Sequence, residues 1–186
     1  MTIEKGQNSL PSSEQNLGAG IKPTIVLMRH AARDFSDDGL SAEGDRQSKQ
    51  LPEILVARGL TGKILIESSP KRRTRATLRA LAEVTGQKIL VNTDLDERDP
   101  SETHLAFEQR VKDFCDKIVL WAQNLLVAAA PVKVETTRLA CSHIDWLEAA
   151  LQYLPSDETE LGRSESWAPM AIRSYQFEDG IWRRHT

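Results

Sequence analysis

Residues 24–33 read Thr-Ile-Val-Leu-Met-Arg-His-Ala-Ala-Arg, an apolar run that ends abruptly in charge. The aliphatic and β-branched run, preceded by Pro23, is typical of a buried strand. Its carboxyl end carries His30 between Arg29 and Arg33. Neighbouring cations disfavour a further positive charge, so we expect His30 to stay neutral and nucleophilic. The flanking guanidinium groups attract an anion, and together these features suggest a histidine that attacks phosphorus.

Strand-like and helix-like patterns alternate along the rest of the chain. Strands are expected at residues 24–28, 64–66, 88–91 and 138–141. Helices are expected from Ser41, from Ser69-Pro70 to Gly86, over about 102–126 and over 145–154, with a kink or break at Pro52. A closing hairpin is expected at residues 171–182, turning at Asp179-Gly180. This alternation predicts an α/β fold, a three-layer sandwich whose mostly parallel sheet has helices on both faces.

The composition limits the domain organisation and the classes of partner. Of the 186 residues, we expect 1–22 to form a disordered or loosely attached tail and 23–186 to form one α/β domain. The formal net charge of -3 argues against a general polyanion binder, so nucleic acid is not an expected partner. We find no apolar segment that predicts a membrane span or a secretory signal. Two cysteines make no disulfide framework or zinc site, and buried reduced thiols would fit a cytoplasmic protein.

Polar residues follow three of the expected strands at the point where each ends. They are Arg29-His30, Ser68-Ser69 and Ser142-His143. In sheets of this kind, ligands bind beyond the carboxyl ends of the strands. The sequence therefore predicts that these three polar strand ends converge on one crevice.

Five short motifs occur in an order that is specific to one known family. They are Arg29-His30-Ala31-Ala32-Arg33, Leu40-Ser41-x-x-Gly44-x-x-Gln47, Ser68-Ser69-Pro70 followed by Arg73, Leu95-Asp96-Glu97-Arg98 and Ala140-Cys141-Ser142-His143. Over residues 24–182 the chain resembles the histidine phosphatase superfamily, which includes the cofactor-dependent phosphoglycerate mutases. The family usually has glycine where Ala31 stands.

The resemblance implies a role for each polar residue of the motifs. His30 would attack phosphorus and become a transient phosphohistidine. Arg29 and Arg73 would clamp the phosphoryl oxygens, and His143 would donate a hydrogen bond to them, preferably as imidazolium. Glu97 would protonate the leaving oxygen and then deprotonate water. Because arginines can supply the charge stabilisation, we expect no metal and no cofactor.

A second branch of the superfamily suggests two further candidate residues. The acid-phosphatase branch carries an arginine three residues after its nucleophile, where Arg33 stands here. That branch places aspartate directly after its second histidine, whereas here Ile144 intervenes before Asp145. Glu97 is therefore the expected acid and Asp145 the alternative. Glu97 also lies in a charged stretch that could be only a solvated loop.

Taken together, the motifs predict a metal-independent phosphatase that hydrolyses phosphomonoesters. The alternatives are a phosphohistidine protein phosphatase, a phosphoglycerate mutase-like phosphotransferase and, less favoured, a catalytically silent phosphate-binding protein. Arg73 lies in Lys71-Arg72-Arg73-Thr74-Arg75, which alone would also fit a basic nucleic-acid face. Helical spacing points these arginines in different directions, so we expect only one to reach the crevice. The expected substrate is a phosphorylated small molecule or a phosphoprotein, and the oligomeric state is left open.

Overall fold

A single six-stranded sheet forms the centre of the protein. The structure is a computed structural model that describes residues 22–60, 63–127 and 136–185. The described strands are β1 Thr24–Arg29, β2 Ile64–Ser68, β3 Ile89–Val91, β4 Thr137–Ser142, β5 Ile172–Glu178 and β6 Ile181–His185. They lie in the order β3-β2-β4-β1-β5-β6. The first four strands are parallel, β5 runs antiparallel to β1, and β6 runs antiparallel to β5. The expected mostly parallel sheet is confirmed. The proposed tail lies outside the described residues, apart from the exposed Lys22.

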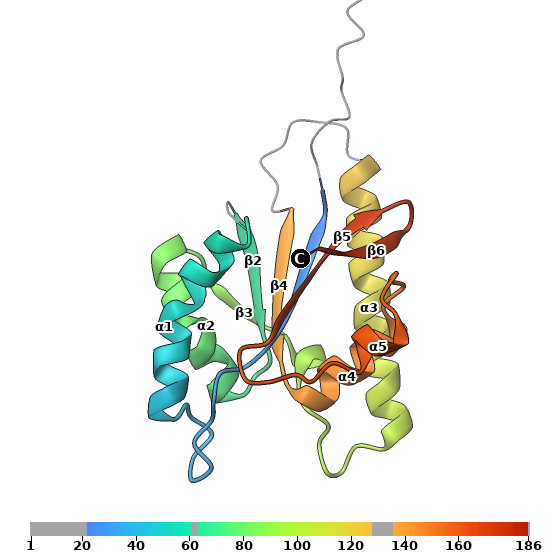
Figure 1. The fold of residues 1–186 in the computed structure, drawn as a ribbon. Helices are drawn as coiled ribbons and strands as arrows, with labels where there is room; N and C mark the ends of the chain where they lie inside the picture. The colour runs from blue at the N-terminus through green and yellow to red at the C-terminus, as the bar shows by residue number, and fades with distance from the viewer. Residues whose placement is uncertain (1–21, 61–62, 128–135, 186) are drawn as a thin grey trace, which may run out of the picture.

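Helices cover both faces of this sheet, as the three-layer prediction requires (Figure 1). One face carries α1 Ala42–Ala57 and α2 Arg72–Thr85. The other carries α3 His104–Val127 and α4 Ile144–Tyr153. Two short elements are not expected from the sequence, the 3-10 turn η1 Thr93–Leu95 and α5 Glu160–Arg163.

Strand β1 shows why the opening sequence reads as one continuous apolar run. Successive side chains of a strand point to opposite faces of the sheet. Ile25 and Leu27 enter the core beneath α3 and α4, whereas Val26 and Met28 enter the core beneath α1 and α2. Because both faces are covered, β1 has no polar alternation until Arg29.

The helix boundaries differ from expectation at two places. Helix α1 begins after the expected cap Ser41 but runs through Pro52 without a break. The neighbouring Leu51 and Leu55 are fully buried, so their packing outweighs the about 3 kcal/mol that an internal proline costs. Helix α2 begins at Arg72 rather than at Pro70, and its cap position is Lys71.

The displaced start of α2 has a cause in the tertiary structure. The Ser69 hydroxyl, expected to cap the helix, accepts the Lys71 N–H only at 3.3 Å and lies closer, at 2.8 Å, to Nε2 of His143. The Arg72 N–H donates to the Asp38 carboxylate at 2.7 Å, so a distant loop satisfies the helix end. The other end follows the prediction, because Gly86 adopts the left-handed conformation (φ 66°) and ends the helix.

Both cysteines are free and buried, as expected. Burial raises the pKa of the Cys115 thiol to about 12 and also raises the pKa of Cys141. Within the described ranges, no helix combines the length and the apolar character needed to cross a membrane.

Candidate active site

Three strand ends meet at one edge of the sheet. In the parallel pair of β1 and β4, Arg29 lies opposite Ser142, and the His30 N–H donates to the Ser142 carbonyl at 3.1 Å. The Ser69 N–H, just beyond β2, donates to the Cys141 carbonyl at 3.2 Å. These backbone bonds place His30, Ser69 and His143 side by side, which confirms the predicted convergence.

The hydrogen bonds of His30 define which of its ring nitrogens carries the proton. Nδ1 lies 2.6 Å from the Ala31 carbonyl oxygen. Because a carbonyl oxygen can only accept a hydrogen bond, Nδ1 is the protonated nitrogen. Nε2 accepts from Nε of Arg73 at 3.3 Å and therefore presents its lone pair. Burial is the main cause that lowers the pKa of His30 to about 4, and the positive charges of Arg73, Arg29 and Arg33 lower it further. The ring is therefore neutral and nucleophilic near neutral pH, in agreement with the expectation from the sequence.

Arg73 connects the polar side chains of the site. Its guanidinium is buried, and Nη2 donates to Oε2 of Glu97 at 2.5 Å and to Nδ1 of His143 at 3.0 Å. Nη1 bonds to the Asp38 carboxylate. Its neighbours Arg72 and Arg75 are exposed, so only one arginine of the basic run reaches the crevice, as the helical spacing predicts.

The protonation of His143 differs from the sequence-based expectation. Its Nδ1 accepts from Arg73, so Nε2 carries the proton and donates to the Ser69 hydroxyl at 2.8 Å. Burial is the largest cause that lowers the pKa of His143 to about 2, followed by the charge of Arg73. His143 is thus a neutral ring here and not the expected imidazolium, because a buried cation beside Arg73 would be strongly disfavoured.

The Arg29 guanidinium is anchored from one side. Its Nη1 donates to the Trp167 carbonyl at 2.5 Å, and its Nε is buried without a hydrogen-bond partner in the described part of the chain. Burial and the nearby Arg33 lower the pKa of Arg29. Arg33 itself is exposed, with its guanidinium 4.5 Å from the centre of the Phe35 ring.

Both candidate acids border the same cleft. The Glu97 side chain is 34% exposed and lies 3.8 Å from Nδ1 of His143 and 3.5 Å from Nζ of Lys71. Oδ2 of Asp145 accepts the Arg98 N–H at 2.8 Å. The geometry therefore leaves both carboxylates available to a ligand, and the preference for Glu97 stays a prediction.

All the candidate residues line one cleft of about 370 Å³. Its walls are Arg29, His30, Ala32, Arg33, Phe35, Arg73, Glu97, His143, Ile144, Asp145 and Pro169. Among the residues that the structure describes, no three His, Cys, Asp or Glu side chains are grouped as metal ligands would be. The expectation that the chemistry needs no metal stays a prediction.

Two groups that hold this site together were not predicted from the sequence. Asp38 binds Arg73 and the start of α2, and the Trp167 carbonyl binds Arg29. Asp38 lies in a polar loop with no local pattern, and a backbone carbonyl carries no signal of residue type. Trp167 is in turn positioned by Arg173, whose guanidinium lies 4.3 Å from the centre of its ring.

The sequence of this chain matches one family. The model of the Histidine phosphatase superfamily (branch 1) matches residues 25–135, more than half of the chain. The chain belongs to the histidine phosphatase superfamily. The matched region contains Arg29, His30, Arg73 and Glu97, whereas His143 lies beyond it. No curated protein matches the chain.

Solved structures of this superfamily's fold lie close to the present structure. Phosphoserine phosphatase of Entamoeba histolytica is 14% identical with a TM-score of 0.65, covering 88% of this chain and 95% of its own. The mycobacterial glucosyl-3-phosphoglycerate phosphatase is 17% identical with a TM-score of 0.65, covering 88% and 97%. The protein histidine phosphatase SixA is 17% identical with a TM-score of 0.62, covering 88% and 94%. At these identities the likeness shows the shared fold.

Proposed function

We propose that this protein is a metal-independent phosphatase that hydrolyses phosphomonoesters through a phosphohistidine on His30. The observation that carries the proposal is the tautomer of His30. The Nδ1–H bond to the Ala31 carbonyl leaves the Nε2 lone pair facing Arg73, in the cleft that Arg29 also lines. A neutral nucleophile among fixed cations suits attack on a phosphate dianion.

The first step forms a bond from Nε2 of His30 to phosphorus and breaks the bond from phosphorus to the ester oxygen. Arg29 and Arg73 hold the non-bridging oxygens, and His143 donates to the same oxygens with the Nε2–H that bonds to the Ser69 hydroxyl in the free protein. Glu97 gives a proton to the departing oxygen, so the alcohol leaves neutral. The positive charge that develops on the His30 ring is stabilised by its Nδ1–H bond to the Ala31 carbonyl, 2.6 Å away.

The second step returns the enzyme to its starting state. Glu97, now a carboxylate, takes a proton from water, and the water oxygen attacks phosphorus as the bond to Nε2 breaks. Inorganic phosphate leaves, and His30 regains its lone pair. Neither step needs a metal ion, because the arginines supply the positive charge.

One observation bears on the mutase alternative. Only residues 98–103 separate Glu97 from the start of α3. Such a short connection offers little chain to close over a sugar phosphate and exclude water from the phosphohistidine. This feature supports hydrolysis over phosphoryl transfer to a second hydroxyl.

The rim of the cleft could also contact a protein substrate, so the proposal includes phosphoproteins. Phe35 lines the cleft and is 85% exposed, so it offers an apolar contact to a bulky partner. Two buried free thiols fit a reducing compartment, and we therefore propose a cytoplasmic location.

The decisive experiment measures hydrolysis of p-nitrophenyl phosphate in the presence of a chelator. We expect turnover by the wild type and a loss on the order of 1,000-fold or more in His30→Ala. His185→Ala is the matched control, because His185 is exposed at the end of β6, and it should keep full activity. An acid-labile, alkali-stable phosphoenzyme should form in the wild type and not in His30→Ala.

Two results would contradict the proposal. They are absence of wild-type turnover above that of His30→Ala, and loss of activity on chelation. A phosphoenzyme without turnover would instead favour a phosphotransferase.

A further inference from the structure

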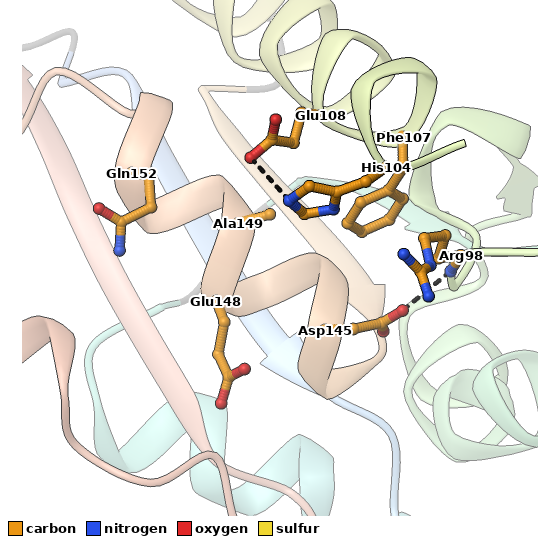
Figure 2. Close-up of a pocket in the computed structure, with 8 residues that line it drawn as sticks. All are labelled: Arg98, His104, Phe107, Glu108, Asp145, Glu148, Ala149 and Gln152. Carbon is orange, nitrogen blue, oxygen red and sulfur yellow. Dashed lines mark hydrogen bonds and ion pairs between the residues drawn. The ribbon is translucent and has the colours of Figure 1, made fainter. Parts of the chain in front are cut away.

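A second hollow adjoins the cleft that holds His30. This groove, of about 530 Å³, lies between the start of α3 and the outer side of α4 (Figure 2). It is lined by Arg98, His104, Phe107, Glu108, Asp145, Glu148, Ala149 and Gln152. None of these residues except Asp145 has a role in the hydrolysis described above.

Asp145 and the segment Glu97-Arg98 form a ridge between the groove and the catalytic cleft. Asp145 lines both hollows, and its Oδ2 accepts the Arg98 N–H at 2.8 Å. Arg98 lines the groove, and the preceding residue Glu97 lines the cleft. The two candidate proton donors therefore stand on the boundary between the hollows.

The position of the ridge determines where a leaving group extends. In an in-line displacement, the nucleophile and the leaving oxygen lie on opposite sides of phosphorus. With His30 as the nucleophile, the leaving oxygen points to the acid that protonates it. Whether that acid is Glu97 or Asp145, the remainder of the leaving group then meets the ridge, and the groove lies on its far side.

The two hollows carry opposite charge. The cleft contains the three guanidinium groups of Arg29, Arg33 and Arg73 against the carboxylates of Glu97 and of Asp145, which the two hollows share. The groove contains the carboxylates of Glu108, Asp145 and Glu148 against the single guanidinium of Arg98. His104 contributes a ring whose Nε2 lies 3.3 Å from Oε1 of Glu108, and Figure 2 shows this pair at the α3 side of the groove. A ligand that spans both hollows meets a cationic end and an acidic end.

We propose that this groove binds the leaving group of the substrate and selects leaving groups that carry an ammonium or guanidinium group. The inference rests on the proposed function and names its substrate class, a zwitterionic phosphomonoester. The same carboxylates disfavour a leaving group that carries a carboxylate. Because Glu148 is exposed and Glu108 half-buried, solvent screens their charge, and we expect a preference of about three- to tenfold.

The test compares ω-aminoalkyl phosphates with the methyl-ended and carboxylate-ended esters of the same chain length. We expect kcat/KM to be highest for the amino series, with a maximum at one chain length, and lowest for the carboxylate series. The double variant Glu108→Gln/Glu148→Gln should remove the difference between the amino and methyl series. Its kcat/KM for p-nitrophenyl phosphate should stay unchanged, which also shows that the variant folds. Glu53→Gln, an exposed carboxylate on α1, is the matched control.

A second arm distinguishes a small amine from a basic peptide. Phosphoserine peptides with Lys or Gln next to the phosphorylated residue replace the alkyl esters. A preference confined to the Lys peptide supports a protein source of the cation, and one confined to the alkyl series supports a small molecule.

The inference is overturned if the wild type shows no amino preference in either series. It is also overturned if the preference survives in the double variant. Hydrolysis of p-nitrophenyl phosphate reports on the proposed function separately, so a wild type that hydrolyses this ester without an amino preference refutes only the groove assignment.

Discussion

Acidification from about pH 7 to about pH 5 is expected to destabilise the fold through two buried histidines. The folded-state pKa of His30 is about 4, against an ordinary value of 6.5. The unfolded chain therefore binds a proton before the folded one, and the stability that neutral His30 contributes is lost as the pH falls from 6.5 towards 4. At about pH 5, proton linkage gives a loss of about 2 kcal/mol for His30. His143, with a pKa of about 2, should lose a similar amount.

The assay is urea unfolding followed by far-ultraviolet circular dichroism at the two pH values. The wild type should lose about 4 kcal/mol of unfolding free energy between them, with an unchanged m-value. In His30→Asn and in His143→Asn the loss should shrink by about 2 kcal/mol each, because one titrating ring is gone. His185→Asn, exposed on β6, should behave as the wild type. Equal losses in the wild type and both buried-histidine variants would refute the assignment of neutral, buried rings.

Three other substitutions test separate parts of the structure. Glu97→Gln should slow hydrolysis of alkyl phosphates far more than that of aryl phosphates, because good leaving groups need no proton; an equal effect on both would point to Asp145 or to a structural role. Gly44→Ala should lower the unfolding free energy by about 1–3 kcal/mol in a urea titration, because a Cβ atom at position 44 would lie 2.0 Å from the Ala32 carbonyl oxygen. An unchanged midpoint would show that α1 shifts freely to make room. Arg33→Ala should raise KM for p-nitrophenyl phosphate roughly two- to fivefold with kcat unchanged, because an exposed cation contributes little binding energy; a large fall in kcat would place Arg33 on the reacting phosphoryl group.

The strands and their polar ends were predictable because the signals are local. Strand β1 is buried on both faces, so its apolar run is uninterrupted up to Met28 and is followed directly by Arg29 and His30. Strand β4 contains Arg138, which pairs with Glu67, and its buried run from Leu139 ends at Ser142 just before His143. Parallel strands bring their carboxyl ends to one edge, so a linear pattern was enough to predict that these residues meet.

Local signals failed where a side chain had a stronger partner far along the chain. Ser69-Pro70 is a good helix start by its residue types, but the Ser69 hydroxyl bonds to His143 and α2 begins later. Pro52 is a poor helix residue, but the core around Leu51 keeps α1 unbroken.

The α/β layers, the strand ends that carry the histidines and the family of the chain follow from the sequence alone, because periodicity and motif order are properties of neighbouring residues. The tautomer of His30 and the neutral state of His143 depend on tertiary contacts. The Ala31 carbonyl selects the tautomer of His30, and burial beside Arg73 makes His143 neutral instead of cationic. Proton affinity depends on the distances and solvent exposure of groups that are far apart in the chain, so the arginines beside His30 predicted its neutral ring whereas no local pattern predicted that of His143.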